Sequence, residues 1–83
     1  MIKYNISNHA KSMIIEREIQ LNWINSAIQV PDRKILIEEK EIHYIKKISA
    51  FGNRYLRVVV NPTVNPMNIV TVFFDRRLIK GKK

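Results

Sequence analysis

The sequence has no cysteine and only two glycines among its 83 residues. The lack of cysteine excludes disulfides, thiolate metal sites and a cysteine nucleophile, and it fits a reducing compartment. The shortage of glycine excludes the glycine-rich loops that hold phosphates and dinucleotides. No apolar run has the length of a signal peptide or a bilayer span, so we expect a cytoplasmic protein without membrane contact. His9 and His43 lie far apart in the sequence, and we expect neither a metal nor another cofactor.

What the chain has in excess is positive charge. Fifteen Lys and Arg against seven Asp and Glu give a net charge of +8. Five of these basic residues lie in the last eight positions, so residues 78–83 are expected to form a basic tail on a modestly basic body. The charge favours polyanionic partners, such as nucleic acid, an acidic protein or a membrane surface, although a solvated tail accounts for it equally well. A hydrophobic content of 46% predicts one folded domain over residues 1–83.

Apolar residues spaced as on one face of a helix predict two short helices near the N-terminus. The first runs over residues 8–17 and follows Ser7, whose hydroxyl can cap it. The second runs from about residue 21 to 29, and Pro31 ends it. The apolar faces consist of Ala10, Met13 and Ile14 in the first helix and of Leu21, Ile24, Ala27 and Ile28 in the second. With so short a connection the two helices form an αα-hairpin, which must pack on another element to be stable.

Alternating and β-branched segments then predict four strands, over residues 34–39, 42–49, 54–60 and 68–75. Short connections between consecutive strands favour an antiparallel meander. The last strand contains the β-branched and aromatic run Ile69–Phe74, which is typical of a central strand buried on both faces. Residues 1–6 form either a short edge strand or a lead-in. The predicted fold class is α+β, with an N-terminal two-helix hairpin packed on a four-stranded antiparallel sheet.

Two charged residues interrupt the apolar pattern on elements that we expect to pack together. Arg17 falls at the angle of the apolar stripe of the first helix, so we expect its side chain to face the interior. A buried guanidinium needs a partner, because an unpaired buried charge is strongly destabilising. Asp75, at the end of the last strand, is the expected partner of Arg17 in a structural ion pair that ties the helices to the sheet.

Arg57 and His9 are the polar residues that most invite a functional interpretation. Arg57 interrupts an otherwise apolar strand, and we expect it on the same sheet as Thr71 and Asp75, whose side chains share a face of their own strand. It is half of an ion pair, a phosphate contact or an arginine on a solvated face. His9 lies in the first turn of the first helix. It is either a proton-transfer group or a helix-end histidine bonded to nearby backbone.

The basic residues near the C-terminus form the positively charged patch that is best suited to bind a nucleic acid. We expect Arg77 and Lys80 to bind it, together with Lys46, Lys47 and Arg54 on one basic face. Tyr44, Tyr55 or Phe51 would then stack on bases. The alternative is a solvated charge run, with aromatic residues that belong to the core.

These motifs together resemble a bacterial family of domains of unknown function, family 4258. The resemblance lies in Ser7-x-His9-Ala10, Met13-Ile14-x-x-Arg17-x-Ile19, Trp23-Ile24 and Pro31-Asp32, and in the strand motifs Leu56–Asn61 and Val70–Arg77. It covers nearly the whole chain, from Ser7 to Arg77. Two residues depart from the pattern of the family: Met13 stands where Arg or Gln is usual, and Glu18 stands where Gly is common.

The layout that this resemblance implies is similar to the RelE/ParE-like toxin fold. It implies a metal-independent endoribonuclease that acts on RNA, or a poison of translation or replication, silenced in either case by an antitoxin-like protein. Cleavage through the 2′-hydroxyl needs an acid–base group and cations around the developing negative charge. By this analogy His9 would carry protons, Arg57 and Arg76 would hold the phosphate with Arg17 as a further candidate, and Thr71 would add a hydrogen bond. The alternatives are a non-catalytic module that binds nucleic acid or a partner protein, and a domain whose charges only maintain the fold.

Overall fold

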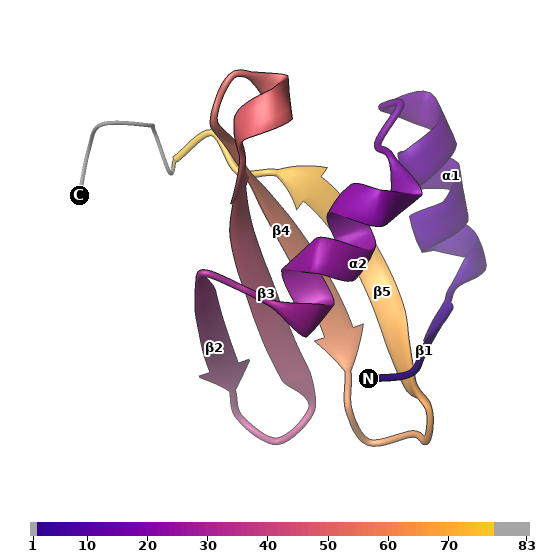
Figure 1. Ribbon diagram of the computed structural model, residues 1–83. Coiled ribbons are helices and arrows are strands. Elements are labelled where there is room, and N and C mark those ends of the chain that lie inside the picture. The colour runs from indigo at the N-terminus through magenta and orange to yellow at the C-terminus, as the bar shows by residue number, and fades with distance from the viewer. Residues whose placement is uncertain (1, 78–83) are drawn as a thin grey trace.

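The computed structural model describes residues 2–77, in which two helices lie on one face of a single sheet (Figure 1). In chain order the elements are β1 (Tyr4–Ile6), α1 (Asn8–Glu16), α2 (Leu21–Gln29), β2 (Arg33–Ile37), β3 (Glu41–Ile48), the 3-10 turn η1 (Ser49–Phe51), β4 (Arg54–Asn61) and β5 (Met67–Phe74). The α+β class is confirmed, and both predicted helices and all four predicted strands are present with ends within two residues of those expected. Neither helix in this described part of the chain is long and apolar enough to span a membrane.

The sheet has five strands, one more than predicted, in the order β1-β5-β4-β3-β2. β2, β3, β4 and β5 pair antiparallel in sequence order, as expected, whereas β1 lies parallel to β5. The backbone N–H of Ser7 continues this edge by donating to the carbonyl oxygen of Ile69 at 3.0 Å. The prediction of a purely antiparallel four-stranded sheet was wrong because a three-residue strand is too short to show an alternating pattern.

The central strand is β4 rather than β5, because β1 extends the sheet beyond β5. Leu56, Val58 and Val60 of β4 are fully buried beneath the helices, and Val59 on the opposite face is only 5% exposed. β5 is less deeply buried, and its Val70 remains exposed where the β4–β5 register shifts. The apolar run of β5 therefore reflects its packing against α1 rather than a central position.

The helices pack on the sheet individually rather than as a hairpin that docks as one unit. α1 begins after Ser7, whose hydroxyl oxygen accepts a hydrogen bond from the backbone N–H of Ala10 at 3.0 Å. α1 contacts β5, whereas α2 lies across β3 and β4 (Figure 1). Ile24 and Ile28 of α2 are fully buried, but Leu21, expected on the same apolar face, is exposed at the first helical position.

The two faces of the sheet have different compositions. On the helix face, the strand residues Ile42, Tyr44, Ile48, Leu56, Val58, Val60, Ile69 and Val72 form the main core together with residues of α1 and α2. We call the opposite side the open face. Its strand residues include Arg33, Ile35, Ile37, Glu41, His43, Ile45, Lys47, Tyr55, Arg57, Val59, Thr71 and Phe73. Within residues 2–77, no helix covers the open face.

Candidate functional site

A line of hydrogen-bonded polar side chains crosses the open face from β3 to the end of β5. His43 Nε2 lies 3.0 Å from Glu41 Oε1, and His43 Nδ1 lies 2.7 Å from Arg57 Nη1. Arg57 Nε donates to Asp75 Oδ2 at 2.8 Å. The guanidinium of Arg77 donates to both oxygens of Asp75, at 3.1 and 3.2 Å. We call these five residues the polar chain.

The register of three strands brings the polar chain together. Arg57 of β4 faces Ile45 of β3, so His43, two residues before Ile45, is its diagonal neighbour. On its other side Arg57 faces Phe73 of β5, two residues before Asp75. Because residues two apart on a strand share a face, His43, Arg57 and Asp75 all meet on the open face.

The polar chain defines the tautomer of His43. A guanidinium can only donate, so His43 Nδ1 accepts from Arg57 through its lone pair. Nε2 then carries the hydrogen and donates it to Glu41. The imidazole is therefore neutral in this arrangement. A hydrogen on Nδ1 would point at the N–H of Arg57 Nη1, and two donors cannot form a hydrogen bond. His43 is held as a base whose lone pair faces a cation.

Asp75 is the most deeply buried charged residue of the polar chain, with a side chain only 2% exposed. Side-chain hydrogen bonds from Arg77 hold the pKa of Asp75 below its usual value; burial opposes this effect, while the Arg77 backbone and Arg57 reinforce it. The Arg77 side chain is 80% exposed, so water screens its attraction for the carboxylate. The Arg57 side chain is 11% exposed, and the Arg57–Asp75 ion pair is therefore the firmer of the two.

Apolar and aromatic side chains flank the polar chain on the open face. Ile45 and Val59 are 1% and 5% exposed although they lie outside the main core. Tyr55 and Phe73 are half-buried neighbours of Arg57 on β4 and β5. Planar rings beside a guanidinium suit the bases and phosphates of a single-stranded nucleic acid.

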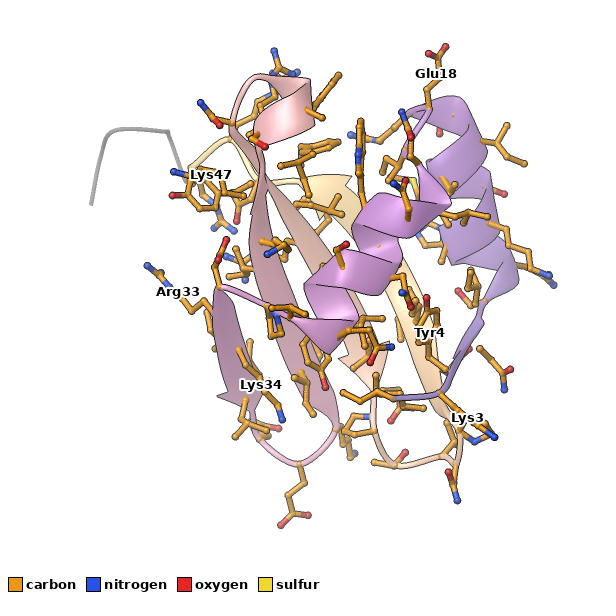
Figure 2. The ribbon with its side chains drawn as sticks, viewed as in Figure 1. Lys3, Tyr4, Glu18, Arg33, Lys34 and Lys47 are labelled. Carbon is orange, nitrogen blue, oxygen red and sulfur yellow. The ribbon has the colours of Figure 1, made fainter. Side chains whose placement is uncertain are left out.

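Two further cations lie on the open face at the start of β2 and the end of β3. Arg33 faces Ile45 in the β2–β3 ladder, and Lys47 follows two residues later on β3. Both side chains are exposed and extend away from α2 (Figure 2). Asp32 offsets part of this charge, because its carboxylate accepts from the backbone N–H of Lys47 at 2.8 Å. The formal charges of the polar chain cancel, so Arg33 and Lys47 leave this end of the open face positive.

In chemical terms the site offers one imidazole base, two carboxylates and several cations. His43 Nδ1 can take a proton once Arg57 moves to another acceptor. Arg57 can donate to an anion while Asp75 fixes its orientation through Nε. Residues 2–77 contain no group of three His, Asp or Glu side chains that could hold a metal ion.

The expected ion pair between Arg17 and Asp75 was wrong, because Asp75 is paired with Arg57 and Arg77. Arg17 is exposed at the end of α1. The helix ends at Glu16, and Arg17 has the non-helical angles φ −101° and ψ 4°. Helical periodicity stops before this residue, so it does not place the Arg17 side chain on the buried stripe.

The residues expected to act together in catalysis are divided between the two layers. Arg57 and Thr71 share the open face, with Thr71 facing Val59 in the β4–β5 ladder. His9 is exposed in the first turn of α1, which packs on the opposite side of the sheet. The structure therefore separates His9 from Arg57.

The single basic face expected from Lys46, Lys47, Arg54 and Arg77 was also wrong, because the structure places Lys47 and Arg77 on the open face and the other two on the helix face. Lys46 lies on the helix face, where its Nζ donates to the carbonyl oxygen of Val30 at 3.0 Å. Arg54 lies on that face too, with its guanidinium 5.1 Å from the centre of the Phe51 ring. Arg77 instead joins the open face through Asp75. Residues at alternate positions of a strand point to opposite sides, so basic residues close in sequence need not form one patch.

The remaining expected binding residues have other positions. Arg76 is exposed beyond the end of β5, and Lys80 lies outside the described residues. Tyr44 is buried in the core, and Phe51 packs against Trp23 with ring centres 5.4 Å apart. Of the three aromatic residues proposed to stack on bases, Tyr55 alone lies on the open face.

Glu41 and His43 are candidate site residues that the sequence interpretation missed. Their signal was present, because Glu41, His43, Ile45 and Lys47 occupy alternate positions of one strand and share a face. Placing that face beside Arg57 requires the exact register of the β3–β4 hairpin. A slip of one residue would send His43 to the other side of the sheet.

In a comparison with protein families, the chain matches the model described as "Domain of unknown function (DUF4258)" over residues 6–74. The matched segment contains Glu41, His43 and Arg57, whereas Asp75 and Arg77 lie just beyond it. No curated protein and no solved structure matches the chain, so the likeness to RelE/ParE-like toxins is not confirmed. Because the family model spans most of the sequence, from β1 to the end of β5, the chain belongs to the DUF4258 family.

Proposed function

We propose that the open face binds RNA and cleaves it by metal-independent acid–base chemistry. One observation carries this proposal: the neutral His43 Nδ1 lies 2.7 Å from Arg57 Nη1. The pair places a proton acceptor beside a cation on a face of the sheet that no helix within residues 2–77 covers. Phosphodiester cleavage through the 2′-hydroxyl requires both of these groups.

In the proposed reaction a phosphate oxygen accepts hydrogen bonds from Arg57 and displaces His43 Nδ1. The freed lone pair of His43 takes the proton of the neighbouring 2′-hydroxyl. The 2′-oxygen then attacks phosphorus while the bond to the 5′-oxygen breaks, which gives a 2′,3′-cyclic phosphate. The leaving 5′-oxygen takes a proton from the solvent. Glu41 accepts from Nε2–H and stabilises the imidazolium that forms.

The neighbouring residues support this reaction by position. Asp75 orients the guanidinium of Arg57 through Nε and leaves its other nitrogens for phosphate. Thr71, on the same face, adds a hydrogen bond to the sugar or phosphate. Tyr55 and Phe73 stack on the bases on either side of the cleaved bond. The proposal thus retains Arg57 and Thr71 from the sequence interpretation and replaces His9 with His43.

Cleavage of a labelled single-stranded RNA in EDTA tests the proposal. We expect RNA to be cut to products with 2′,3′-cyclic phosphate ends, and the same strand with 2′-deoxyribose to stay intact. His43→Asn should lower the rate by about 10²–10⁴-fold, the usual contribution of one acid–base group. Arg57→Lys should weaken both binding and cleavage. A guanidinium can bind Asp75 through one edge and the phosphate through another, whereas a single ammonium group cannot do both.

The matched control is His9→Asn, the same substitution on the opposite side of the sheet. It should leave the rate unchanged, and thermal unfolding of both variants separates lost chemistry from lost folding. RNA that stays intact with the wild-type protein, or equal rates for the two histidine variants, would contradict the proposal.

A second candidate is a module that binds RNA or an acidic, antitoxin-like protein without catalysis. The observation that favours it is that both ring nitrogens of His43 already have partners. It predicts RNA or protein affinity that falls in Arg57→Lys and no RNA cleavage in any variant. If cleavage does occur, an acidic protein that covers the open face would act as its inhibitor.

A further inference from the structure

Four polar side chains surround Ile45 on the open face. Arg33 of β2 and Arg57 of β4 lie on its two sides in the same row of the sheet. His43 and Lys47 lie two residues before and two residues after it on β3, so they share its face. Ile45 itself is only 1% exposed. Three cations and one imidazole base are thus grouped around a single buried aliphatic side chain.

The three cations of this group differ in their partners. Arg57 is bound to two other members of the polar chain. Neither Arg33 nor Lys47 forms an ion pair with a carboxylate of residues 2–77, and both side chains are exposed. The carboxylate of Asp32 is close by, but it accepts from the backbone N–H of Lys47. Arg33 and Lys47 are therefore available to an anion that approaches from solvent.

The spacing of the two arginines suits a chain of phosphates. Arg33 and Arg57 lie on the strands that flank β3. Neighbouring strands are about 4.8 Å apart, so the backbones of the two arginines are about 10 Å apart. Their long side chains can lean toward each other, and each guanidinium matches the geometry of a phosphate. The pair can hold two consecutive phosphates of an extended single strand, whose neighbouring phosphates lie several ångströms apart.

The position of His43 gives such a strand a direction. In cleavage the attacking 2′-hydroxyl belongs to the nucleotide on the 5′ side of the scissile phosphate. His43 lies on β3, and Arg57, which holds that phosphate in the proposed reaction, lies on β4. The attacking nucleotide therefore lies over β3, and its own 5′-phosphate continues toward Arg33 on β2. The leaving nucleotide lies toward β5, where Phe73 is half-buried on the same face.

We propose that Arg33 and Lys47 form a subsite for the phosphate one nucleotide to the 5′ side of the scissile phosphate in single-stranded RNA. The direction of the strand, with its 5′ side at β2 and its 3′ side at β5, rests on the proposed function, because it follows from the role of His43. The phosphate subsite itself does not require cleavage. Since phosphate contacts carry no sequence information, the subsite selects for a strand that continues to the 5′ side and not for a particular base.

Binding of deoxydinucleotides tests the subsite without any cleavage. An NMR titration compares the thymidine dinucleotide TpT with its 5′-phosphate pTpT and its 3′-phosphate TpTp. The two phosphorylated forms carry the same charge and differ only in the end at which the extra phosphate lies. pTpT should bind about fivefold more tightly than TpTp, the scale of a contact between exposed charges.

Arg33→Gln and Lys34→Gln are the matched variants, because they remove the same charge from adjacent residues of β2. Lys34 faces the helix side, where its Nζ lies 5.7 Å from the centre of the Tyr44 ring, and Figure 2 shows the two side chains leaving β2 in different directions. Arg33→Gln should bring the affinities for pTpT and TpTp together, whereas Lys34→Gln should keep them apart. Thermal unfolding checks that both variants are folded. A wild-type protein that binds pTpT no better than TpTp, or a preference that survives Arg33→Gln, would overturn the subsite.

A deoxy strand with one ribonucleotide tests the direction, because it can be cut at one position only. A neutral methylphosphonate in place of the phosphate one nucleotide to the 5′ side of the cut should raise KM about fivefold with little change in kcat. The same replacement one nucleotide to the 3′ side should have a smaller effect. The reverse order would overturn the direction alone. A strand that is not cut at all would overturn the direction together with the proposed function, whereas the preference for pTpT still decides the subsite.

Discussion

The two faces of this sheet bury similar aliphatic side chains by different means. On the helix face, Ile69 is fully buried within the core that α1 and α2 complete. On the open face, Ile45 is 1% exposed although no helix within residues 2–77 lies over it. In the sheet Ile45 lies between Arg33 and Arg57, two of the longest side chains on that face. Long charged side chains cover apolar surface with their stems, so the two arginines shield Ile45 from water as the helices shield the core on the other face.

The difference concerns stability, because on the open face the polar chain occupies positions that apolar side chains could fill. Replacing a buried ion pair with apolar residues of similar size is often neutral or stabilising, so stability alone does not require the Arg57–Asp75 ion pair. Every deeply buried side-chain nitrogen and oxygen among the described residues has a hydrogen-bond partner. A fully satisfied polar chain is rigid and presents His43 and Arg57 in one geometry. That is the arrangement a binding or catalytic surface requires.

The largest expected effect comes from matched cavities on the two faces. Ile69→Ala should lower the free energy of unfolding by about 4 kcal/mol, near the upper end for such substitutions, because rigid helices keep the cavity open. Ile45→Ala should cost about 2 kcal/mol, because the flexible stems of the flanking arginines can move into the space. Urea denaturation of both variants measures the difference. Equal costs would show that the open face is packed as rigidly as the core.

A smaller loss is expected when the polar chain is broken at its most buried member. Asp75→Asn leaves the Arg57 guanidinium, itself 11% exposed, without a counter-charge and should cost about 3 kcal/mol at neutral pH. The pKa of Asp75 is lowered in the folded state, so as the pH falls the unfolded state takes up the proton first. The stabilisation is complete above the ordinary carboxyl value of 3.8 and is lost as the pH falls below it.

Urea denaturation over a pH series checks this prediction. The difference between wild type and Asp75→Asn should be constant near neutral pH and shrink in acid. Glu16→Gln, at an exposed carboxylate of α1, is the control and should show little difference at any pH. A difference that grows in acid would contradict the assigned direction of the Asp75 pKa.

Strand alternation was sufficient to predict part of this site. The pattern of β5 placed Thr71 and Asp75 on one face, and that of β4 placed Arg57 opposite Leu56, Val58 and Val60; the structure confirms both placements. Both strands are long and apolar, so their period of two is clear in the sequence. The partner of Asp75 was wrong for a local reason. α1 ends one residue before Arg17, and the ends of helices are the least predictable part of their pattern.

His43 could not be placed from the sequence because the β3–β4 hairpin leaves its register open. A four-residue turn over residues 50–53 would pair Ser49 with Arg54, and His43 would then lie on the face opposite Arg57. The structure has five connecting residues, so Ile48 pairs with Arg54 and His43 joins Arg57. The extra residue belongs to the 3-10 turn η1, which is held from outside the hairpin by the packing of Phe51 on Trp23 and Phe74. A tertiary contact thus decides which face His43 occupies.

The smallest expected effect lies at the exposed end of the polar chain. Glu41 is 45% exposed, so Glu41→Gln should change the free energy of unfolding by less than about 1 kcal/mol, as for other exposed pairs. The glutamine oxygen can still accept from His43 Nε2–H, and Arg57 still donates to Nδ1, so the tautomer should be the same in both proteins. Nitrogen NMR of the imidazole checks this directly, because protonated and unprotonated ring nitrogens have distinct shifts. A hydrogen on Nδ1 in the wild type would contradict the Arg57 contact, and with it the contrast between a charge-covered open face and a helix-covered core.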